Sequence, residues 1–369
     1  MPVLKKIVIQ DFRNIELQEL SFSPGINCIW GGNGEGKTNL LDAIYYLSMT
    51  KSGIQTAEKF NFRRGTSAFA LSGLYRLREG DDARFSIQVT DCAEKKIRKD
   101  DKPYQKISDH IGALPIVLVS PADSDLVNES GDERRRFVNA FVSQMDRKYL
   151  IDLQQYGKLL AQRNRLLKEH EPDEGLLETF DLQMEPLAAS IAQVRTKFCD
   201  DLLPIVQNYY SAISGGREQV GINYRSDLSK RSFSSLMKDH RQRDAALGYT
   251  CSGIHRDDFV FSMDGFPIRH CGSQGQQKSF LVALKFAQYE IMKKRWGFPP
   301  ILLLDDLFDK LDMDRAGNLL KMVAGNDFGQ IFISDTDKTR TETLLGHIST
   351  DRAFFRASSG SFTKIDGDI

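Results

Sequence analysis

A glycine-rich segment near the start of the chain carries the clearest chemical signal in the sequence. It fits the pattern G-x-x-x-x-G-K-[ST] of a phosphate-binding loop and consists of Gly31, Gly32, Asn33, Gly34, Glu35, Gly36, Lys37 and Thr38. Glycines let backbone N–H groups wrap the phosphates of a nucleotide, and the Lys37 ammonium can reach the β and γ oxygens. The Thr38 hydroxyl is of the kind that ligates Mg²⁺. We therefore predict that this loop binds ATP and Mg²⁺, with Lys37 also acting in catalysis.

Two carboxylates end an apolar segment much later in the chain. The segment Ile301–Leu304 is followed directly by Asp305 and Asp306. Such a run predicts a strand that is buried on both faces of a parallel sheet, with its last side chains at the sheet edge where phosphates bind. We predict that Asp305 holds Mg²⁺ through water and that Asp306 is catalytic, polarising the water that attacks the γ-phosphate.

A third segment, Ser273–Gln277, has the sequence Ser-Gln-Gly-Gln-Gln and precedes a run with helical spacing. It resembles the signature motif of ABC-type ATPases, whose serine and glycine lie at a helix N-terminus. Backbone N–H groups and the helix dipole favour an anion at such a position. The resemblance implies that Ser273, Gly275 and Gln276 bind the γ-phosphate of a nucleotide held by a second copy of the chain.

Two segments that follow the carboxylates bear on turnover. Leu307–Asp312 resembles the D-loop of ABC ATPases, which helps to carry contacts across the dimer. Gln330–Thr336 has the pattern of a strand that ends in polar groups, and most ABC ATPases place a switch histidine there. This chain has Ser334 and Thr336 instead. Either hydroxyl could contact the γ-phosphate, but as a weaker activator than histidine, so we predict slow ATP hydrolysis.

The elements that must position these groups can be traced along the chain. Strand patterns run from residue 3 to 30 and lead into the glycine loop, after which helical spacing begins. Residues 68–107 alternate apolar and polar in short bursts, which predicts an antiparallel meander, and residues 115–119 predict a buried strand. From residue 133 to about 214 the apolar residues recur three and four apart, which predicts long helices broken near residues 171–173.

These patterns predict an α/β fold. We expect an ABC-type P-loop ATPase head with a mixed sheet and an antiparallel β subdomain, plus an inserted helical domain. In this division residues 1–130 form the N-terminal half of the head, residues 131–247 the helical insertion, and residues 248–369 the C-terminal half of the head. The insertion has a plausible size for a domain.

The composition is that of an ordinary globular protein. Of 369 residues, 41% are apolar and 27% are charged, and 50 basic residues balance 50 acidic ones. Any contact with nucleic acid must therefore come from a local patch. The five cysteines are scattered, which indicates neither a disulfide framework nor a zinc site. No run is long enough for a membrane span and the first residues lack a signal-peptide core, so we expect a cytoplasmic protein without a membrane partner.

With these elements assembled, the chain resembles the RecF family of bacterial DNA replication and recombination-repair proteins, in the SMC-like branch of ABC ATPases. The resemblance covers nearly the whole chain. Beyond the ATPase motifs it depends on five segments, which are Asp11–Asn14, Val119–Asp123, Glu133–Phe137, Gly253–Asp258 and Asp305-Asp306. The short helical insertion, in place of the long coiled coils of SMC proteins, agrees with this family. The chain departs from the family pattern at Ala122, Ile254 and Asp309-Lys310.

The resemblance implies a DNA-binding ATPase that forms a homodimer around ATP. It implies recognition of gaps, where single-stranded DNA meets double-stranded DNA, and recombinase loading together with the RecO and RecR proteins. It also implies a part in recombinational repair, replication restart and the SOS response. An ATP-dependent dimer is physically reasonable, because a nucleotide that touches both protomers stabilises the closed state.

Several interpretations stay open at this stage. Arg13 and Asn14 are candidate nucleotide-binding residues, but a structural salt bridge would explain Arg13 equally well. The basic clusters either contact DNA phosphates or form solvated faces, and they are Arg63-Arg64, Lys95–Lys99, Arg134–Arg136, Arg163–Arg165 and Lys293–Arg295. Two other functions also remain, namely a nucleotide-gated scaffold with little turnover and a P-loop kinase whose lid the helical insertion supplies.

Overall fold

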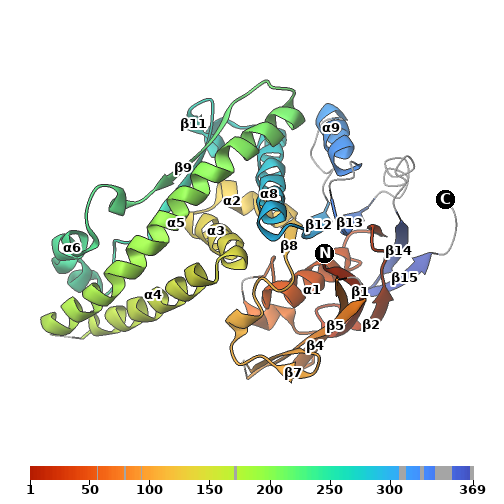
Figure 1. Cartoon of the computed structure of the whole chain (residues 1–369), viewed down its shortest axis with the longest axis horizontal. Coiled ribbons are helices and arrows are strands. Elements are labelled where there is room, and N and C mark those ends of the chain that lie inside the picture. The colour runs from red at the N-terminus through yellow and green to blue at the C-terminus, as the bar shows by residue number, and fades with distance from the viewer. Residues whose placement is uncertain are drawn as a thin grey trace. The chain divides into compact units, whose positions relative to one another are not determined.

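The computed structural model describes residues 1–55, 57–78, 80–92, 94–169, 173–306, 313–324, 328–336 and 351–365. Its contacts divide the chain into two compact units (Figure 1). The first unit comprises Met1–Asp123, Ala212–Ser214 and Leu281–Ile369, and the second comprises Ser124–Ser211 and Gly215–Phe280. The second unit thus includes residues 248–280, which the sequence analysis assigned to the head, and the division into three domains stays a prediction.

A six-stranded sheet in the first unit brings the predicted motifs to one edge. Its strands lie in the order β15, β14, β3, β13, β12, β8, and all neighbours are parallel except β14 and β15. The bounds are β3 Ile26–Trp30, β8 Ile116–Val119, β12 Ile301–Asp305, β13 Ile331–Asp335, β14 Arg352–Ser358 and β15 Ser361–Ile365. β12 and β13 are buried along their whole length, as expected for central strands covered on both faces.

The antiparallel subdomain predicted from the sequence is the second sheet of the first unit. Its strands lie in the order β2, β1, β4, β5, β6, β7. Their bounds are β1 Val3–Phe12, β2 Ile15–Ser21, β4 Ala68–Arg78, β5 Asp81–Thr90, β6 Lys95–Lys99 and β7 Lys102–Pro103. Short 3-10 turns occur at Glu58–Asn61, Ile107–Asp109 and Pro121–Ser124, and a further helix, α9, spans Met313–Ala324.

Helix α1 (Lys37–Met49) lies between the two sheets and contacts strands of both. Its apolar residues are therefore buried almost all the way round, as the full burial of Leu40, Ile44 and Tyr46 shows. The rings of Phe12 and Phe69 meet Tyr46 edge-on, at centroid distances of 6.0 and 5.4 Å. This packing fixes the helix whose first residues complete the glycine loop.

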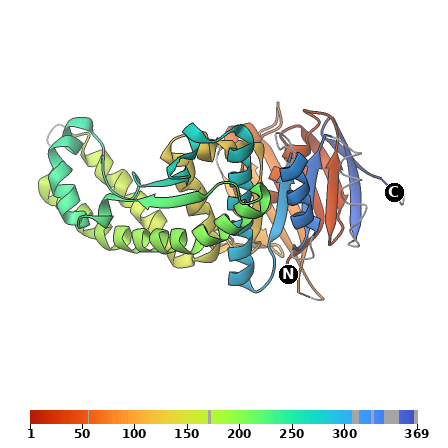
Figure 2. The ribbon, with the colours of Figure 1, turned by 90° about the horizontal axis from the view of Figure 1, so that it is seen from above.

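The second unit contains the predicted helices and a small sheet. The helices are α2 Asp125–Asn128, α3 Gly131–Met145, α4 Arg147–Leu166, α5 Glu174–Ser214, α6 Phe233–Leu247 and α7 Ile268–Cys271, and α8 Gln274–Trp296 begins in this unit. The sheet has the order β11, β10, β9, with bounds Phe266–Pro267, Asp258–Met263 and Val220–Arg225. β9 runs alongside α5, where Gln207 Nε2 donates to the Val220 oxygen at 2.9 Å (Figures 1 and 2). Within the described ranges, we find no helix long and apolar enough to cross a membrane.

Buried ion pairs tie the helices of the second unit together. Arg163 on α4 is fully buried and contacts Asp181 on α5 at 2.8 Å and Asp244 on α6 at 2.9 Å. Arg195 on α5 is also buried and contacts Asp257, just before β10, at 3.2 Å. Charges inside a core are stable only with partners, so these pairs specify how the helices meet.

Candidate nucleotide site

The glycine loop joins β3 to α1, as the sequence predicts. Gly34 and Gly36 have φ angles of +82° and +102°, a region that favours glycine. Gly31 is needed for space, because a Cβ there would lie 2.6 Å from the backbone oxygen of Ala357. Lys37 and Thr38 open α1, so their backbone N–H groups belong to a helix N-terminus, where an anion is favoured. The loop therefore has the backbone shape and the donors of a phosphate site.

The Lys37 ammonium is held at this loop. Lys37 is only 5% exposed, and its Nζ donates to the backbone oxygens of Gly31 at 2.8 Å and Gly32 at 2.9 Å. A buried ammonium needs such partners, and an ammonium has three donors in all. The positive charge is thereby kept beside the backbone groups that would surround a phosphate.

Thr38 and Asp305 meet across 267 residues of chain, where Thr38 Oγ1 donates to Asp305 Oδ2 at 2.8 Å. Burial raises the pKa of Asp305 above its ordinary value, and this outweighs the hydrogen bonds from Ser334 and Thr38, which lower it. Among the described residues no group of three or more His, Cys, Asp or Glu side chains could hold a metal alone. The oxygen donors Thr38 and Asp305 fit Mg²⁺, which takes one or two protein ligands together with nucleotide phosphates and water.

Ser334, a candidate for contact with the γ-phosphate, lies beside Asp305 and Asp306. Its hydroxyl, fully buried at the end of β13, donates to Asp305 and accepts from the backbone N–H of Asp306 at 3.2 Å. A serine has one proton to donate, and here that proton goes to the Asp305 carboxylate while the hydroxyl oxygen holds the Asp306 backbone. Thr336, the other candidate, is exposed, and the predicted D-loop at Leu307–Asp312 lies outside the described residues.

Arg13 forms the structural salt bridge that the sequence left open. Its guanidinium pairs with the buried Asp42 of α1 and donates to Asn39 Oδ1 at 3.0 Å. Asn14 accepts from Asn39 Nδ2 at 2.7 Å and lies close to Gly36, where a Cβ would be 2.8 Å from Asn14 Nδ2. The β1–β2 turn thus supports α1 and the glycine loop, and direct contact of Arg13 or Asn14 with a nucleotide stays a prediction.

The turn between β14 and β15 also contacts the loop, a feature that sequence reasoning missed. The Ser359 backbone N–H donates to the Glu35 carboxylate, and the Gly360 N–H donates to the Glu35 backbone oxygen at 2.9 Å. A Ser-Gly pair between two strand patterns does signal a tight turn. Nothing in the sequence, however, places that turn beside a residue 324 positions earlier.

The signature-like segment lies in the second unit, at the start of α8. Ser273 Oγ accepts from the Gln276 N–H at 3.3 Å, and Gln276 Oε1 accepts from the Ser273 N–H at 2.8 Å. This reciprocal pair is a capping box, which satisfies two of the free donors of a helix start. Gln276 also donates to Glu218 at 2.7 Å. The segment is therefore a well-formed helix N-terminus, and its contact with a nucleotide stays a prediction.

The segment Gly253–Asp258 is a structural junction of the second unit. Asp258 pairs with Arg134 of α3 at 2.8 Å, and Asp257 contacts Arg195 of α5. His255 Nδ1 lies 3.1 Å from the Tyr156 hydroxyl and its Nε2 lies 3.0 Å from the Thr250 oxygen. Burial lowers the pKa of His255 to about 4, so the ring is neutral and both nitrogens are used in hydrogen bonds. These residues therefore join α3, α4 and α5 to β10.

The basic clusters differ in how far ion pairs occupy them. Arg134, Arg135 and Arg136 each contact an acidic side chain, and Arg163 is fully buried. The segment 94–106 holds six basic and three acidic residues, and its ion pairs join Lys95 to Glu58 at 3.0 Å and Lys96 to Glu94 at 3.2 Å. We define the basic face as the exposed residues Arg84, Lys96, Arg98, Lys102 and Lys106 of the β5–β7 region. Register and alternation place Arg84, Lys96 and Arg98 on one side of the sheet.

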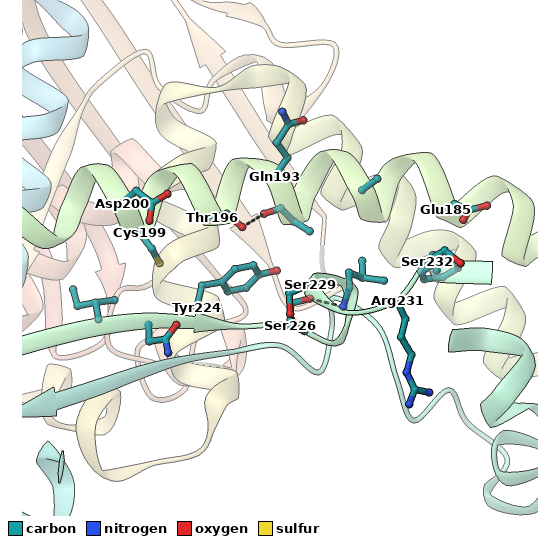
Figure 3. Close-up of a pocket in the computed structure, with 16 residues that line it drawn as sticks. Glu185, Gln193, Thr196, Cys199, Asp200, Tyr224, Ser226, Ser229, Arg231 and Ser232 are labelled. Atoms are coloured by element: carbon teal, nitrogen blue, oxygen red, sulfur yellow. Dashed lines mark hydrogen bonds between the residues drawn. The ribbon is translucent and has the colours of Figure 1, made fainter. Parts of the chain in front are cut away.

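The second unit also contains a cavity of about 590 Å³ between α5 and β9 (Figure 3). It is lined on α5 by residues that include Gln193, Thr196 and Cys199, and on the other side by Tyr224 and the turn that follows β9. Burial raises the pKa of the Cys199 thiol to about 12, which leaves it protonated and unreactive. None of the residues predicted to bind nucleotide lines this cavity.

Known proteins similar to this chain match it over nearly its whole length. An AAA-domain family model matches residues 6–197. A protein of Bacteroides fragilis named DNA replication and repair protein RecF is 41% identical over 365 residues, which is 99% of this chain and 99% of that protein. A solved structure described as the recombination mediator protein RecF with ATP in the RecFOR pathway has a TM-score of 0.89 and 29% identity, covering 99% of this chain and 98% of its own. An Smc head domain from Pyrococcus furiosus shares the fold, with a TM-score of 0.57 and 14% identity over 99% of this chain and 96% of its own.

Proposed function

The chain belongs to the RecF family of DNA replication and repair proteins, and we propose that it binds ATP with Mg²⁺ in the Gly31–Thr38 loop and hydrolyses it slowly. The family resemblance and the ABC-type head fold predicted from the sequence are confirmed. The observation that carries the proposal for ATP is the 2.8 Å hydrogen bond from Thr38 to Asp305, because it joins the two residues predicted to hold Mg²⁺.

In this proposal the chain's own groups bind and orient the triphosphate. Backbone N–H groups of the loop and of the α1 N-terminus donate to phosphate oxygens. Lys37 exchanges its bonds to the Gly31 and Gly32 oxygens for bonds to the β and γ oxygens. Thr38 would hold Mg²⁺ directly and Asp305 through water, and the bound cation would neutralise charge on the β- and γ-phosphates.

Asp306 is the proposed catalytic carboxylate. It follows Asp305 directly, and its backbone N–H is held by the Ser334 hydroxyl at 3.2 Å. A carboxylate in this position would accept a hydrogen bond from the attacking water and orient it towards the γ-phosphate. The fixed backbone of Asp306 supports this role, because a protein promotes phosphoryl transfer largely by orienting the reacting groups.

We further propose that ATP is shared between two copies of the chain. Ser273 and Gly275 lie at a capped helix N-terminus, which suits a γ-phosphate presented by the partner's loop. Such a dimer would be ATP-dependent, because the nucleotide binds the paired state better than the separate protomers.

DNA is the proposed macromolecular ligand, and the basic face is its proposed contact. Arg84, Lys96 and Arg98 are exposed on one side of a sheet, and Lys102 and Lys106 follow close by in the chain. Lysine and arginine side chains arranged in this way neutralise phosphates without reading sequence, so binding should weaken as salt rises. The proposal also includes gap recognition, recombinase loading with RecO and RecR, replication restart and the SOS response. These four points are supported only by membership of the RecF family.

A nucleotide-gated scaffold with little turnover is the second candidate. The observation that favours it is the Ser334 hydroxyl, which is occupied by Asp305 where most ABC ATPases use a switch histidine on the γ-phosphate. In that case ATP binding alone would drive dimerisation and DNA binding, and hydrolysis would only reset the protein.

The test is ATP turnover, measured with and without gapped duplex DNA, for the wild type and for Lys37→Met and Asp306→Asn. An ATPase should lose turnover in both variants, and Asp306→Asn should still bind ATP. Wild-type binding and dimerisation without measurable turnover would favour the scaffold. Unchanged hydrolysis in both variants would show that the site is assigned wrongly.

A further inference from the structure

Glu35 is the only charged residue inside the glycine loop, between Gly31 and Gly36. Its carboxylate accepts from the Ser359 N–H and its backbone oxygen accepts from the Gly360 N–H at 2.9 Å. Both donors are backbone groups of the two-residue turn between β14 and β15. One turn therefore holds the side chain and the main chain of a single loop residue.

The fit around these contacts is close. Gly31 faces Ala357 of β14, so that a Cβ on Gly31 would lie 2.6 Å from the Ala357 oxygen. Gly360 faces the backbone of Asn14, so that a Cβ on Gly360 would overlap the Asn14 oxygen. Asn14 in turn lies against Gly36. The loop is thus enclosed by the β14–β15 turn and by the β1–β2 turn, and each contact requires a glycine.

Such contacts matter for a loop of this composition. Four of its first six residues are glycine, and glycine loses more conformational freedom on ordering than any other residue. A carboxylate within such a loop also repels phosphates unless it is held elsewhere. The Gly360 N–H orders the main chain at Glu35, and the Ser359 N–H binds the Glu35 carboxylate.

We propose that the Ser359-Gly360 turn is a positioning element for the nucleotide, which acts through Glu35 to keep the loop in its phosphate-binding shape. The proposal rests on the proposed ATP site. It predicts that nucleotide affinity depends on the fit of the β14–β15 turn, although no residue of that turn belongs to the nucleotide-binding motif.

The chain offers a matched control for the test. Ser359 and Gly360 have φ angles of 48° and 82°, and Asp264 and Gly265, in the two-residue turn between β10 and β11, have φ angles of 49° and 83°. Alanine therefore meets the same backbone strain at Gly360 and Gly265. A Cβ at Gly265, however, has nothing within 4 Å. Of the two added Cβ atoms, only the one at Gly360 meets a neighbour, which is Asn14.

The experiment compares Mg²⁺-ATP affinity by calorimetry in the wild type, Gly360→Ala and Gly265→Ala, with thermal unfolding of the nucleotide-free proteins. We expect Gly360→Ala to lose more thermal stability than Gly265→Ala, because only its Cβ overlaps the Asn14 backbone. We also expect an ATP Kd about tenfold weaker in Gly360→Ala only, the size expected for losing hydrogen bonds that hold the loop. Equal Kd values in the two variants would overturn the inference. No ATP binding by the wild type would instead overturn the proposed function.

A second pair of variants keeps the test decisive if Gly360→Ala does not fold. Glu35→Gln retains an acceptor oxygen for the Ser359 N–H, whereas Glu35→Ala removes it. We expect Glu35→Gln to bind ATP within about twofold of the wild type and Glu35→Ala to bind about tenfold more weakly. ATP binding by Glu35→Ala that is equal to or tighter than that of the wild type would mean that the carboxylate only repels phosphates, and the inference would be wrong.

Discussion

At the scale of single residues, the Ser334 hydroxyl donates to the Asp305 carboxylate and accepts from the backbone N–H of Asp306. We expect Ser334→Ala to lower kcat for ATP by about tenfold, because a lost hydrogen bond to a charged group is worth about 1.5–3 kcal/mol and part of it acts in the transition state. KM should change little, since the loop is unaltered. Steady-state assays beside the exposed Thr336→Ala are the check. A loss confined to Thr336→Ala would assign the activating hydroxyl to that residue and contradict our assignment.

His255 makes a residue-scale prediction about acid stability. Burial lowers the pKa of His255 from 6.5 to about 4. Between these two pH values the imidazole is protonated in the unfolded chain but neutral in the folded protein, so acid favours unfolding. This contribution to stability is present above pH 6.5 and is lost progressively as the pH falls to about 4, by about 3 kcal/mol in all. Urea unfolding at stepwise pH should therefore show a smaller acid loss in His255→Gln than in the wild type. Parallel pH profiles would rule this out.

At the scale of elements, a site could be predicted from the sequence where all of its residues lie in one short segment. The loop Gly31–Thr38 and the carboxylate pair at the end of β12 could be predicted because a local pattern specifies each. The contact of Ser334 with Asp305 and the contact of Glu35 with the β14–β15 turn were missed, because both depend on partners from distant strands. Periodicity reports which face of an element is buried, but not which polar group lies opposite.

The basic face is an element-scale feature, and its prediction concerns salt. We expect Lys96→Glu with Arg98→Glu to weaken binding to gapped duplex and to reduce the slope of log K against log salt by about 2, since each lost phosphate contact removes about 0.9. The matched control is Lys294→Glu with Arg295→Glu, which changes net charge equally. ATP turnover without DNA should be unaffected. Equal losses in both double variants would mean that bulk charge, not this face, determines the affinity.

At the scale of the whole molecule, each proposed ATP site takes residues from two copies of the chain. The loop, Asp305 and Asp306 belong to the first unit, and Ser273 and Gly275 belong to the second. The chain has no net charge, so long-range attraction to DNA is weak and binding must depend on how local surfaces are presented. A dimer formed around ATP would present two such surfaces at once, which would couple nucleotide state to DNA affinity.

The shared site predicts complementation between two inactive proteins. Lys37→Ala destroys the loop and Ser273→Arg blocks the helix N-terminus, so homodimers of either variant contain only damaged sites. A mixed dimer has one site with both defects and one with none. We therefore expect an equal mixture to recover about a quarter of wild-type ATP turnover, since about half of the dimers are mixed and each has one intact site. Circular dichroism should first show that both variants fold. A mixture no more active than its parts would mean that each chain hydrolyses ATP alone, with Ser273 outside the site.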